Sequence, residues 1–379
     1  MSATDTLCGR YALIYQAPGL GPRLVGDATG MRAIFFIPAR GIAGSHAKLV
    51  NDAVFREKTR RTPFKGGHPG HGTPYRNVML LVPNCLLDLE SGKLARFWPR
   101  APREQKTLDE VLQPNLVRAA RALSGMAQRS GLLLSLTAGQ DSRTTLAAAL
   151  LAEVDLEAFT LVNRRDSPHG ARTRILGVDA AVAKEITAAY GISHQVLEEQ
   201  PMDDRLKTYL KANAYKSSYS NRIMPLLAQY GQQRLLHVRS NALEIARAYW
   251  AKHPEVDDAN GAADLFMLKH RKLADQVERV RTAFQDMFHA TDFTAGRQMG
   301  YDSRDMLYWE HRMGAWHSQQ LLCSDLVFDT FNPWNCRAIL TDLLSLPMQD
   351  RANSSFSRAV VDACEGLSKW PINPAKWPE

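Results

Sequence analysis

The chain has 379 residues, of which 45% are hydrophobic and 23% are charged. This length predicts two or three domains at roughly 150 residues each, and the composition excludes a mainly disordered or collagen-like chain. Lysine and arginine outnumber aspartate and glutamate by 47 to 39, which leaves a net charge of +8. The positive balance favours anionic partners, among them nucleic acid, nucleotide, pyrophosphate and acidic substrates. The five cysteines are scattered without a C-x-x-C pair, which argues against a disulfide framework and a structural zinc site.

Apolar runs in the sequence are short. The run at 146–152 is well below the ~18 residues that cross a bilayer. The N-terminal residues lack the basic start and the apolar stretch that are typical of a secretory signal. We therefore expect a cytoplasmic protein that has no membrane partner.

The first part of the chain, residues 1–105, is expected to form a small β-rich domain. Short apolar runs at 11–15, 33–37 and 78–82 predict strands, and segments rich in glycine and proline separate them. A basic stretch between these runs is interpreted either as a solvated loop or as a binding surface; it holds Arg56, Lys58, Arg60, Arg61, Lys65 and Arg76. The segment at 96–102 predicts a linker, which places a domain boundary between residues 105 and 106.

The second part, residues 106–379, changes to alternating helices and strands. Apolar residues recur at helical spacing between 107 and 123. Four apolar runs predict strands, at 132–136, 158–162, 194–197 and 235–238. Helices are predicted between them, at 144–153 and 179–190. This alternation predicts an α/β domain with a doubly wound parallel sheet that has helices on both faces.

One junction in this second domain carries small and polar residues of the kind that bind phosphate. The first strand runs into the next helix through the loop Ser135-Leu136-Thr137-Ala138-Gly139-Gln140-Asp141-Ser142. Exposed N–H groups and the helix dipole favour an anion where a helix begins, and Gly139 permits its close approach. Asp141 beside such a site is explained by a bound Mg²⁺. The loop lacks the lysine of a Walker motif, and an ordinary helix N-cap is the alternative explanation.

The same loop resembles the PP-loop of the N-type ATP pyrophosphatases, usually written S-G-G-x-D-S. Its flanking sequence, LLLSLTAGQDSRTTLAAAL, is most similar to the asparagine synthetase branch of that superfamily. Further segments of the chain are similar to that branch, at 178–194, 237–250, 308–316, 332–335 and 343–347. The resemblance implies cleavage of ATP to AMP and pyrophosphate. A substrate carboxylate would attack the α-phosphorus, and an amine would then displace AMP to form an amide.

The resemblance also implies roles for individual residues. The pyrophosphate would be held by the loop residues Ser135, Leu136, Thr137, Ala138, Gly139, Gln140, Asp141 and Ser142. Val162, at the end of the second strand, would meet adenine at the switch point of the sheet. Asp141 and Glu244 would bind Mg²⁺, and both are candidates for catalysis. Arg164, Arg165 and His169, in the loop that follows Val162, are interpreted either as surface residues or as substrate contacts.

Three departures from the family pattern affect this interpretation. Ala138 replaces the first glycine of the loop, and Glu244 is the one acid left in the second signature. The stretch at 348–358 has no lysine where the family carries a catalytic one. Arg351 and Arg358 are therefore the candidates for stabilising charge on the phosphates, because arginine binds phosphate and stays charged. An impaired or repurposed pocket is the alternative.

The N-terminal part resembles a truncated, degenerate glutaminase domain, an Ntn-hydrolase remnant. Residues 9–14 and the turn Asp27–Arg32 are similar to such a domain, which normally exposes a first-position cysteine as nucleophile. Cys8 follows seven residues, so a structural role is expected for it and no glutaminase activity. The amine would then come from the substrate itself or from a second substrate.

The sequence thus predicts an amide-forming, ATP- and Mg²⁺-dependent ligase. Its expected partners are a small-molecule or peptide carboxylate and an amine, and self-association into a homo-oligomer is left open. A PP-loop enzyme that modifies a tRNA base is one alternative, favoured by the basic charge, and a non-catalytic nucleotide-binding subunit is another. In the helix at 308–316, Trp309 and Trp316 are expected in the core, whereas Glu310 and Arg312 remain unassigned pocket candidates.

Overall fold

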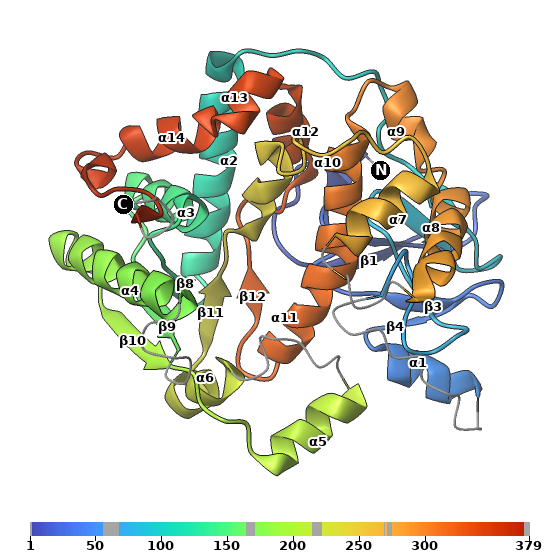
Figure 1. Cartoon of the computed structure of the whole chain (residues 1–379), viewed down its shortest axis with the longest axis horizontal. Coiled ribbons are helices and arrows are strands. Elements are labelled where there is room, and N and C mark those ends of the chain that lie inside the picture. Colours follow the sequence, from blue (N-terminus) through green and yellow to red (C-terminus); the bar gives the residue numbers. More distant parts are fainter. Residues whose placement is uncertain are drawn as a thin grey trace.

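The computed structural model of the chain describes residues 2–55, 68–163, 171–213, 222–268, 270 and 275–374. Figure 1 shows the antiparallel strands of the N-terminal part, in blue, on one side of the molecule, and the long parallel sheet with its helices on the other. None of the helices in these ranges combines the length with the apolar character that a bilayer crossing requires.

Helical elements occur in both parts of the chain. In chain order they are η1 (Ser2–Thr4), α1 (Ala47–Val54), α2 (Leu108–Ala127), α3 (Gln140–Leu151), α4 (Ala171–Ala189), α5 (Asp204–Asn213), α6 (Ile223–Tyr230), η3 (Asn241–Arg247), α7 (Ala259–Met267), α8 (Val277–Thr291), α9 (Thr294–Gln298), α10 (Ser303–Leu307), η5 (Tyr308–His317), α11 (Ser318–Ser324), α12 (Arg337–Ser345), α13 (Met348–Ala352), α14 (Ser355–Asp362) and η6 (Leu367–Lys369). The segments η1, η3 and η6 are 3₁₀ turns, whereas η5 is a π-helix.

Two small antiparallel sheets form the N-terminal part, which confirms its β-rich character. One sheet has the order β1-β2-β6-β7 and the other the order β4-β3-β5. Their strands are β1 (Ala12–Tyr15), β2 (Arg23–Gly26), β3 (Phe35–Ile37), β4 (Ile42–Gly44), β5 (Met79–Leu80), β6 (Cys85–Asp88) and β7 (Leu94–Arg96). Side chains of β3 alternate between two clusters. Phe36 packs with Leu24 and Leu87 of the other sheet, whereas Phe35 and Ile37 pack with α1.

The second part is built on a five-stranded sheet whose neighbouring strands are all parallel. The sheet has the order β10-β9-β8-β11-β12. Its strands are β8 (Gly131–Ser135), β9 (Glu157–Val162), β10 (His194–Glu198), β11 (Leu235–Val238) and β12 (Thr330–Phe331). The predicted parallel sheet is confirmed. The chain winds outward from β8 and then resumes on its other side with β11, so the crevice expected to receive ligands lies at the carboxyl ends of β8 and β11.

Helices cover both faces of the parallel sheet because the side chains of a strand alternate between its faces. Leu132 and Leu134 of β8 lie in a large core cluster with buried residues of α2, α3 and α4. Leu133 belongs to a separate cluster with residues of α6 and of the segment that includes Cys323 at the end of α11. Apolar side chains on both faces of β8 thus pack against helices on either side. The carboxyl end of β8 therefore lies between two helical layers.

The N-terminal strands and the parallel sheet share one hydrophobic core. Met31 and Trp98, from the N-terminal part, lie in the same cluster as the buried residues of α2 and α3. A buried polar network crosses the same junction: the Asp27 carboxylate accepts hydrogen bonds from the Met31 N–H and from Asn335 Nδ2, each at 2.8 Å. The change of pattern near residue 105 therefore marks a change of secondary structure within a continuous core.

Candidate active site

The loop between β8 and α3 has the backbone geometry of an anion site. Gly139 is the N-cap of α3, with φ −74° and ψ 153°, and no side chain caps the helix. The first-turn N–H groups, those of Gln140, Asp141 and Ser142, therefore have no acceptor within the helix. They lie at the positive end of the helix dipole and at the carboxyl edge of the sheet. This arrangement suits a phosphate or pyrophosphate group.

Two hydroxyl groups of the loop hold its shape. Thr137 Oγ1 accepts a hydrogen bond from the Gly139 N–H at 3.0 Å and lies 3.2 Å from Ser142 Oγ. The N–H of Ala138 is also engaged, because it donates to the Asp179 carboxylate on α4 at 2.9 Å. These contacts leave the first turn of α3 as the donor set that faces a ligand.

The other predicted loop residues support this turn. Leu136 is fully buried, and its N–H donates to the carbonyl oxygen of Phe159 on β9 at 2.9 Å. Ser135 ends β8 and is half-buried. Gly139 has a close neighbour, because a Cβ built on it would lie 2.9 Å from Thr137 Oγ1. A larger residue at this position would therefore push against the hydroxyl that shapes the loop.

The C-terminal segment is attached to the back of the loop, a contact that the sequence did not suggest. Arg143 is fully buried, and its Nη2 donates to the carbonyl oxygen of Ala138 at 3.1 Å and to that of Pro371. The N–H of Asn373 donates to the same Ala138 oxygen at 2.9 Å. A buried guanidinium thus ties residues 138 and 371 together, although more than two hundred residues separate them in the sequence.

The two acids predicted as metal ligands converge at the carboxyl ends of β8 and β11. Asp141 lies in the first turn of α3, and Glu244 lies in η3, which follows β11. Arg247 connects them: its Nη2 lies 3.0 Å from Asp141 Oδ2 and 3.7 Å from Glu244 Oε1. The Tyr308 hydroxyl donates to Glu244 Oε2 at 2.9 Å. Sequence analysis did not single out Arg247 or Tyr308 for this cluster.

The chemistry of this pair fits Mg²⁺ in the presence of a nucleotide. Proteins usually hold Mg²⁺ by one or two carboxylates together with phosphate oxygens and water. Asp141 and Glu244 provide two such carboxylates, which approach a common point at Arg247 Nη2. Within the described ranges, no group of three or more His, Cys, Asp and Glu side chains is placed to hold a metal. In that usual pattern, phosphate oxygens and water would complete the coordination of the metal.

The two predicted catalytic arginines lie in different environments. Arg351 of α13 is buried; its Nε donates to the carbonyl oxygen of Ala246 in η3 at 3.0 Å, and its guanidinium pairs with Asp305. Burial raises the pKa of Asp305 to about 6. Arg358 is exposed on α14, on a different face from the buried Phe356 and Val360. The fold therefore places Arg351, and not Arg358, against the segment that carries Glu244.

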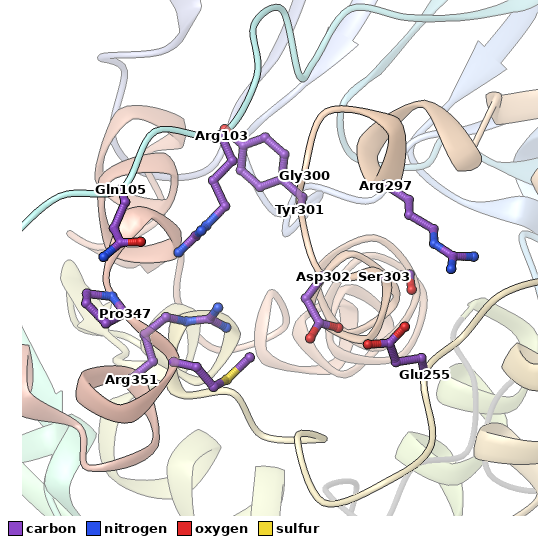
Figure 2. Close-up of a pocket in the computed structure, with 11 residues that line it drawn as sticks. Arg103, Gln105, Glu255, Arg297, Gly300, Tyr301, Asp302, Ser303, Pro347 and Arg351 are labelled. Carbon is purple, nitrogen blue, oxygen red and sulfur yellow. The ribbon is translucent and has the colours of Figure 1, made fainter.

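A cavity of about 440 Å³ lies next to Arg351. Figure 2 shows Arg103 and Arg351 on one side of it, across from Asp302 and Glu255. Arg103 is held in place by carbonyl oxygens at the end of α12, that of Leu344 at 2.7 Å among them. Arg351 also lines a smaller hollow together with Arg247. It therefore stands between the carboxylate cluster and a cavity whose walls carry both signs of charge.

Val162 ends β9, as predicted, but it lies one strand away from the crevice between β8 and β11. Its carbonyl oxygen accepts a hydrogen bond from the Glu199 N–H at 2.9 Å. The switch point of the sheet is thus displaced from the predicted position.

Other candidates lie outside the described residues: Arg164, Arg165, His169, Arg56, Lys58, Arg60, Arg61 and Lys65. Arg76, the described member of the basic stretch, is exposed.

Cys8 is half-buried and has Cys336 as its neighbour. The hydrogen bond with the Cys336 thiol, reinforced by burial, raises the pKa of the Cys8 thiol above its ordinary value. A cysteine nucleophile acts as the thiolate, so this environment disfavours such a role.

Glu310 is part of the packing between the two parts of the molecule. Its carboxylate is fully buried and pairs with Arg96, with Nη1 to Oε1 at 2.6 Å, and accepts a hydrogen bond from Asn84 Nδ2 at 3.0 Å. Glu310, which the sequence left unassigned, is therefore placed in the core between the two parts of the chain. Trp309 is buried as expected, whereas Trp316 is half-buried and stacks under the Arg312 guanidinium at 3.4 Å.

No family model matches the chain, and no curated protein matches it. Partial similarity exists to an NMN synthetase from Francisella tularensis, 18% identical over 38% of this chain and 59% of that one, with a TM-score of 0.26. An NH3-dependent NAD synthetase from Campylobacter jejuni in complex with nitrate is 18% identical over 38% and 61%, with a TM-score of 0.24. A glutamine-dependent NAD+ synthetase from Acinetobacter baumannii in complex with ADP is 11% identical over 63% and 52%, with a TM-score of 0.26. The chain thus spans less than two thirds of each of these proteins, and the chemistry of the site rests on its own residues.

Proposed function

We propose that this chain is an ATP-dependent carbon–nitrogen ligase that forms AMP and pyrophosphate. The observation that carries the proposal is the placement of an uncapped helix N-terminus and two carboxylates at the carboxyl ends of β8 and β11. The N–H groups of α3 suit the β- and γ-phosphates, and Asp141 and Glu244 suit the metal that accompanies a nucleotide. Both elements lie at the switch point of the sheet, which is where doubly wound folds bind their ligands.

The proposed reaction has two steps. A carboxylate oxygen of the substrate attacks the α-phosphorus of ATP; the bond between that phosphorus and the bridging oxygen breaks, and pyrophosphate leaves with its electron pair. The amine nitrogen then attacks the acyl carbon, loses a proton, and AMP departs as an amide forms. Mg²⁺, when bound, would neutralise charge on the phosphates. The protein contributes mainly by positioning the reactants and by stabilising charge.

The residues of the chain have separate parts in this proposal. The first turn of α3 receives the pyrophosphate, and Asp141 and Glu244 hold the metal. Arg351 faces the acyl-phosphate from the side of the cavity, where its buried ion pair with Asp305 fixes its position. The cavity beside Arg351 receives the carboxylate substrate, and the amine comes from that substrate or from a second one and not from glutamine.

The test is pyrophosphate release from ATP and Mg²⁺ in a screen of carboxylate and amine pairs. Asp141→Asn removes a charged ligand at the edge of the site and should lower the rate roughly 10²–10³-fold while the melting temperature changes little. Asp155→Asn, a change of the same kind at an exposed position after α3, serves as the matched control and should keep the wild-type rate. ADP and phosphate as products would contradict the proposal. A wild-type rate in Asp141→Asn would remove Asp141 from the site.

A further inference from the structure

A guanidinium occupies the space between the two carboxylates of the candidate site. A single atom, Arg247 Nη2, approaches both Asp141 Oδ2 and Glu244 Oε1. The three side chains are largely buried, with exposures of 18% for Asp141, 24% for Glu244 and 25% for Arg247. Two carboxylates this close to a common point repel each other unless a cation lies between them. In the free protein that cation is Arg247.

Arg247 makes fewer hydrogen bonds to the rest of the chain than Arg143 and Arg304 do. Its Nε is buried and finds no hydrogen-bond acceptor among the described residues. The Nε of Arg143 also lacks an acceptor in the described part of the chain, but its two Nη atoms donate to three backbone carbonyl oxygens. Arg304 is held by both oxygens of Asp302 and by two carbonyl oxygens. The Arg247 guanidinium therefore depends on the two carboxylates for its position and has few other bonds to break when it leaves them.

We propose that Arg247 is a built-in counter-cation that takes the place of the metal between Asp141 and Glu244 until nucleotide and metal bind together. The guanidinium and a divalent ion compete for the same carboxylate oxygens, so the free protein takes up metal weakly. Once displaced, the guanidinium is close to the first turn of α3 and becomes a partner for phosphate oxygens, which it binds well. Arg247 thus becomes a positioning residue that couples metal entry to nucleotide entry.

Metal binding without nucleotide tests the first half of this proposal. We would titrate the wild type, Arg247→Met and Arg281→Met with Mn²⁺ and follow free Mn²⁺ by electron paramagnetic resonance. Arg281 also pairs with two acids, Glu278 and Asp264, but lies at the surface, so it is the matched control. Arg247→Met should bind Mn²⁺ roughly tenfold or more tightly than the wild type and than Arg281→Met. Equal affinities would overturn the proposal.

Two further variants keep the metal experiment decisive. Arg247→Met combined with Asp141→Asn should lose the gained affinity, which assigns the new Mn²⁺ to this pair of carboxylates. Arg247→Lys keeps the charge and should exclude Mn²⁺ as the wild type does; a lysine variant that binds Mn²⁺ as tightly as Arg247→Met would contradict the competition. If Arg247→Met fails to fold, Arg247→Gln replaces it, since it also removes the charge and keeps a polar side chain.

ATP binding with the metal removed tests the second half, which rests on the proposed function. In EDTA, Arg247→Met should bind ATP roughly tenfold more weakly than the wild type. Without the positive charge of Arg247, the carboxylates of Asp141 and Glu244 repel the triphosphate. Mg²⁺ should restore most of that affinity in Arg247→Met and change the wild-type affinity less. Equal ATP affinities in EDTA would overturn the proposal. A wild type that binds no ATP in either condition would contradict the proposed function, while the Mn²⁺ result still decides the role of Arg247.

Discussion

Glu244 is held on two sides by groups of different chemistry. Tyr308 donates a hydrogen bond to Oε2, and Arg247 approaches Oε1. Burial, together with the nearby Glu244 charge, raises the pKa of Tyr308 far above its ordinary value, so its hydroxyl stays protonated and remains a donor. Because Tyr308 begins the π-helix η5, the position of the acid depends on a helical segment sixty residues further along the chain. π-Helical segments of this kind are often associated with functional sites.

This arrangement gives a prediction for two variants in the same contact. Glu244→Gln removes a full negative charge and should lower the rate of pyrophosphate release roughly 10²–10³-fold and raise the Mg²⁺ requirement. Tyr308→Phe leaves the charge in place and removes one hydrogen bond to it, so the rate should fall only about tenfold. Steady-state rates at several Mg²⁺ concentrations, together with melting temperatures, provide the measurement. A Glu244→Gln enzyme with the wild-type rate and a lowered melting temperature would show that Glu244 only stabilises the first turn of η3.

At the residue scale, the sequence singled out the two acids that converge in the candidate site but not the side chains that contact them. Asp141 follows a strand and a glycine in a motif of recognisable spacing, so local chemistry identified it. Arg247 is separated from Asp141 by more than a hundred residues, and its role depends on how η3 follows β11. Nothing in the local pattern of Arg247 distinguishes it from a surface arginine. Such contacts are set by tertiary structure and stay hidden until the strand order is known.

At the scale of the elements, hydrophobic pattern was most informative where strands are long and buried. β8, β9 and β11 were placed within about one residue because their apolar runs are bounded by polar loops. β12 has only two residues, Thr330 and Phe331, which is too short for an alternating apolar pattern to predict a strand. The π-helix η5 has more residues per turn than an α-helix. Two side chains seven residues apart therefore no longer lie on the same face. That is why Trp309 is buried and Trp316 lies at the edge.

The buried pair of Glu310 in η5 and Arg96 at the end of β7 predicts a stability effect without a catalytic one. Glu310→Gln leaves the Arg96 guanidinium buried without its counter-charge, which should cost about 3–5 kcal/mol of unfolding free energy. Urea unfolding at neutral pH measures this. The exposed Glu278, paired with Arg281 at 2.7 Å, is the control, and Glu278→Gln should cost less than about 1 kcal/mol. A Glu310→Gln protein of normal stability but impaired substrate binding would return Glu310 to the list of pocket residues.

At the scale of the whole molecule, the core of the chain extends across the predicted boundary between residues 105 and 106. Composition and pattern change there, and the structure changes from antiparallel strands to helices. Sequence pattern, however, reports which elements form and not which of them pack together. The buried network of Asp27, Thr29 and Asn335 joins residues about three hundred positions apart, and the Trp309 indole donates to the carbonyl oxygen of Ala28 at 2.6 Å. Both parts are therefore expected to unfold together.

A set of buried histidines makes the stability of this joint core dependent on pH. Burial lowers the pKa of His68, His71 and His311 from 6.5 to about 4. It also lowers the pKa of His237 and of His317 well below 6.5. Each is neutral in the folded protein, whereas the unfolded chain takes up a proton below pH 6.5. Protonation of these histidines therefore costs no unfolding free energy above pH 6.5. As the pH falls from 6.5 toward 4, proton uptake by the unfolded chain lowers the free energy of unfolding.

The loss is about 1.4 kcal/mol per pH unit for each of these histidines. Between pH 6.5 and 5, His68, His71 and His311 would each cost roughly 2 kcal/mol of stability. Asp305 acts in the opposite direction: its folded pKa of about 6 exceeds the ordinary 3.8, so the folded state binds its proton first and gains stability as the pH falls below 6. One such group offsets about one histidine. The net expectation is a steep loss of stability below pH 6.

Urea unfolding at pH 7.5, 6.0 and 5.0 measures this loss, and His311→Phe isolates one histidine. His311 packs against the rings of Phe266 and Phe284, so a phenylalanine suits this apolar packing, although it gives up the contact of His311 Nε2 with the His68 carbonyl oxygen at 3.2 Å. The variant should lose less stability than the wild type between pH 7.5 and 5.0, by roughly 2 kcal/mol, because one proton fewer is taken up on unfolding. A wild type whose free energy of unfolding is the same at all three values would show that these side chains have access to protons and water in the folded protein. Stability that rises toward pH 5 would instead make Asp305, and not the histidines, the dominant titrating group of the core.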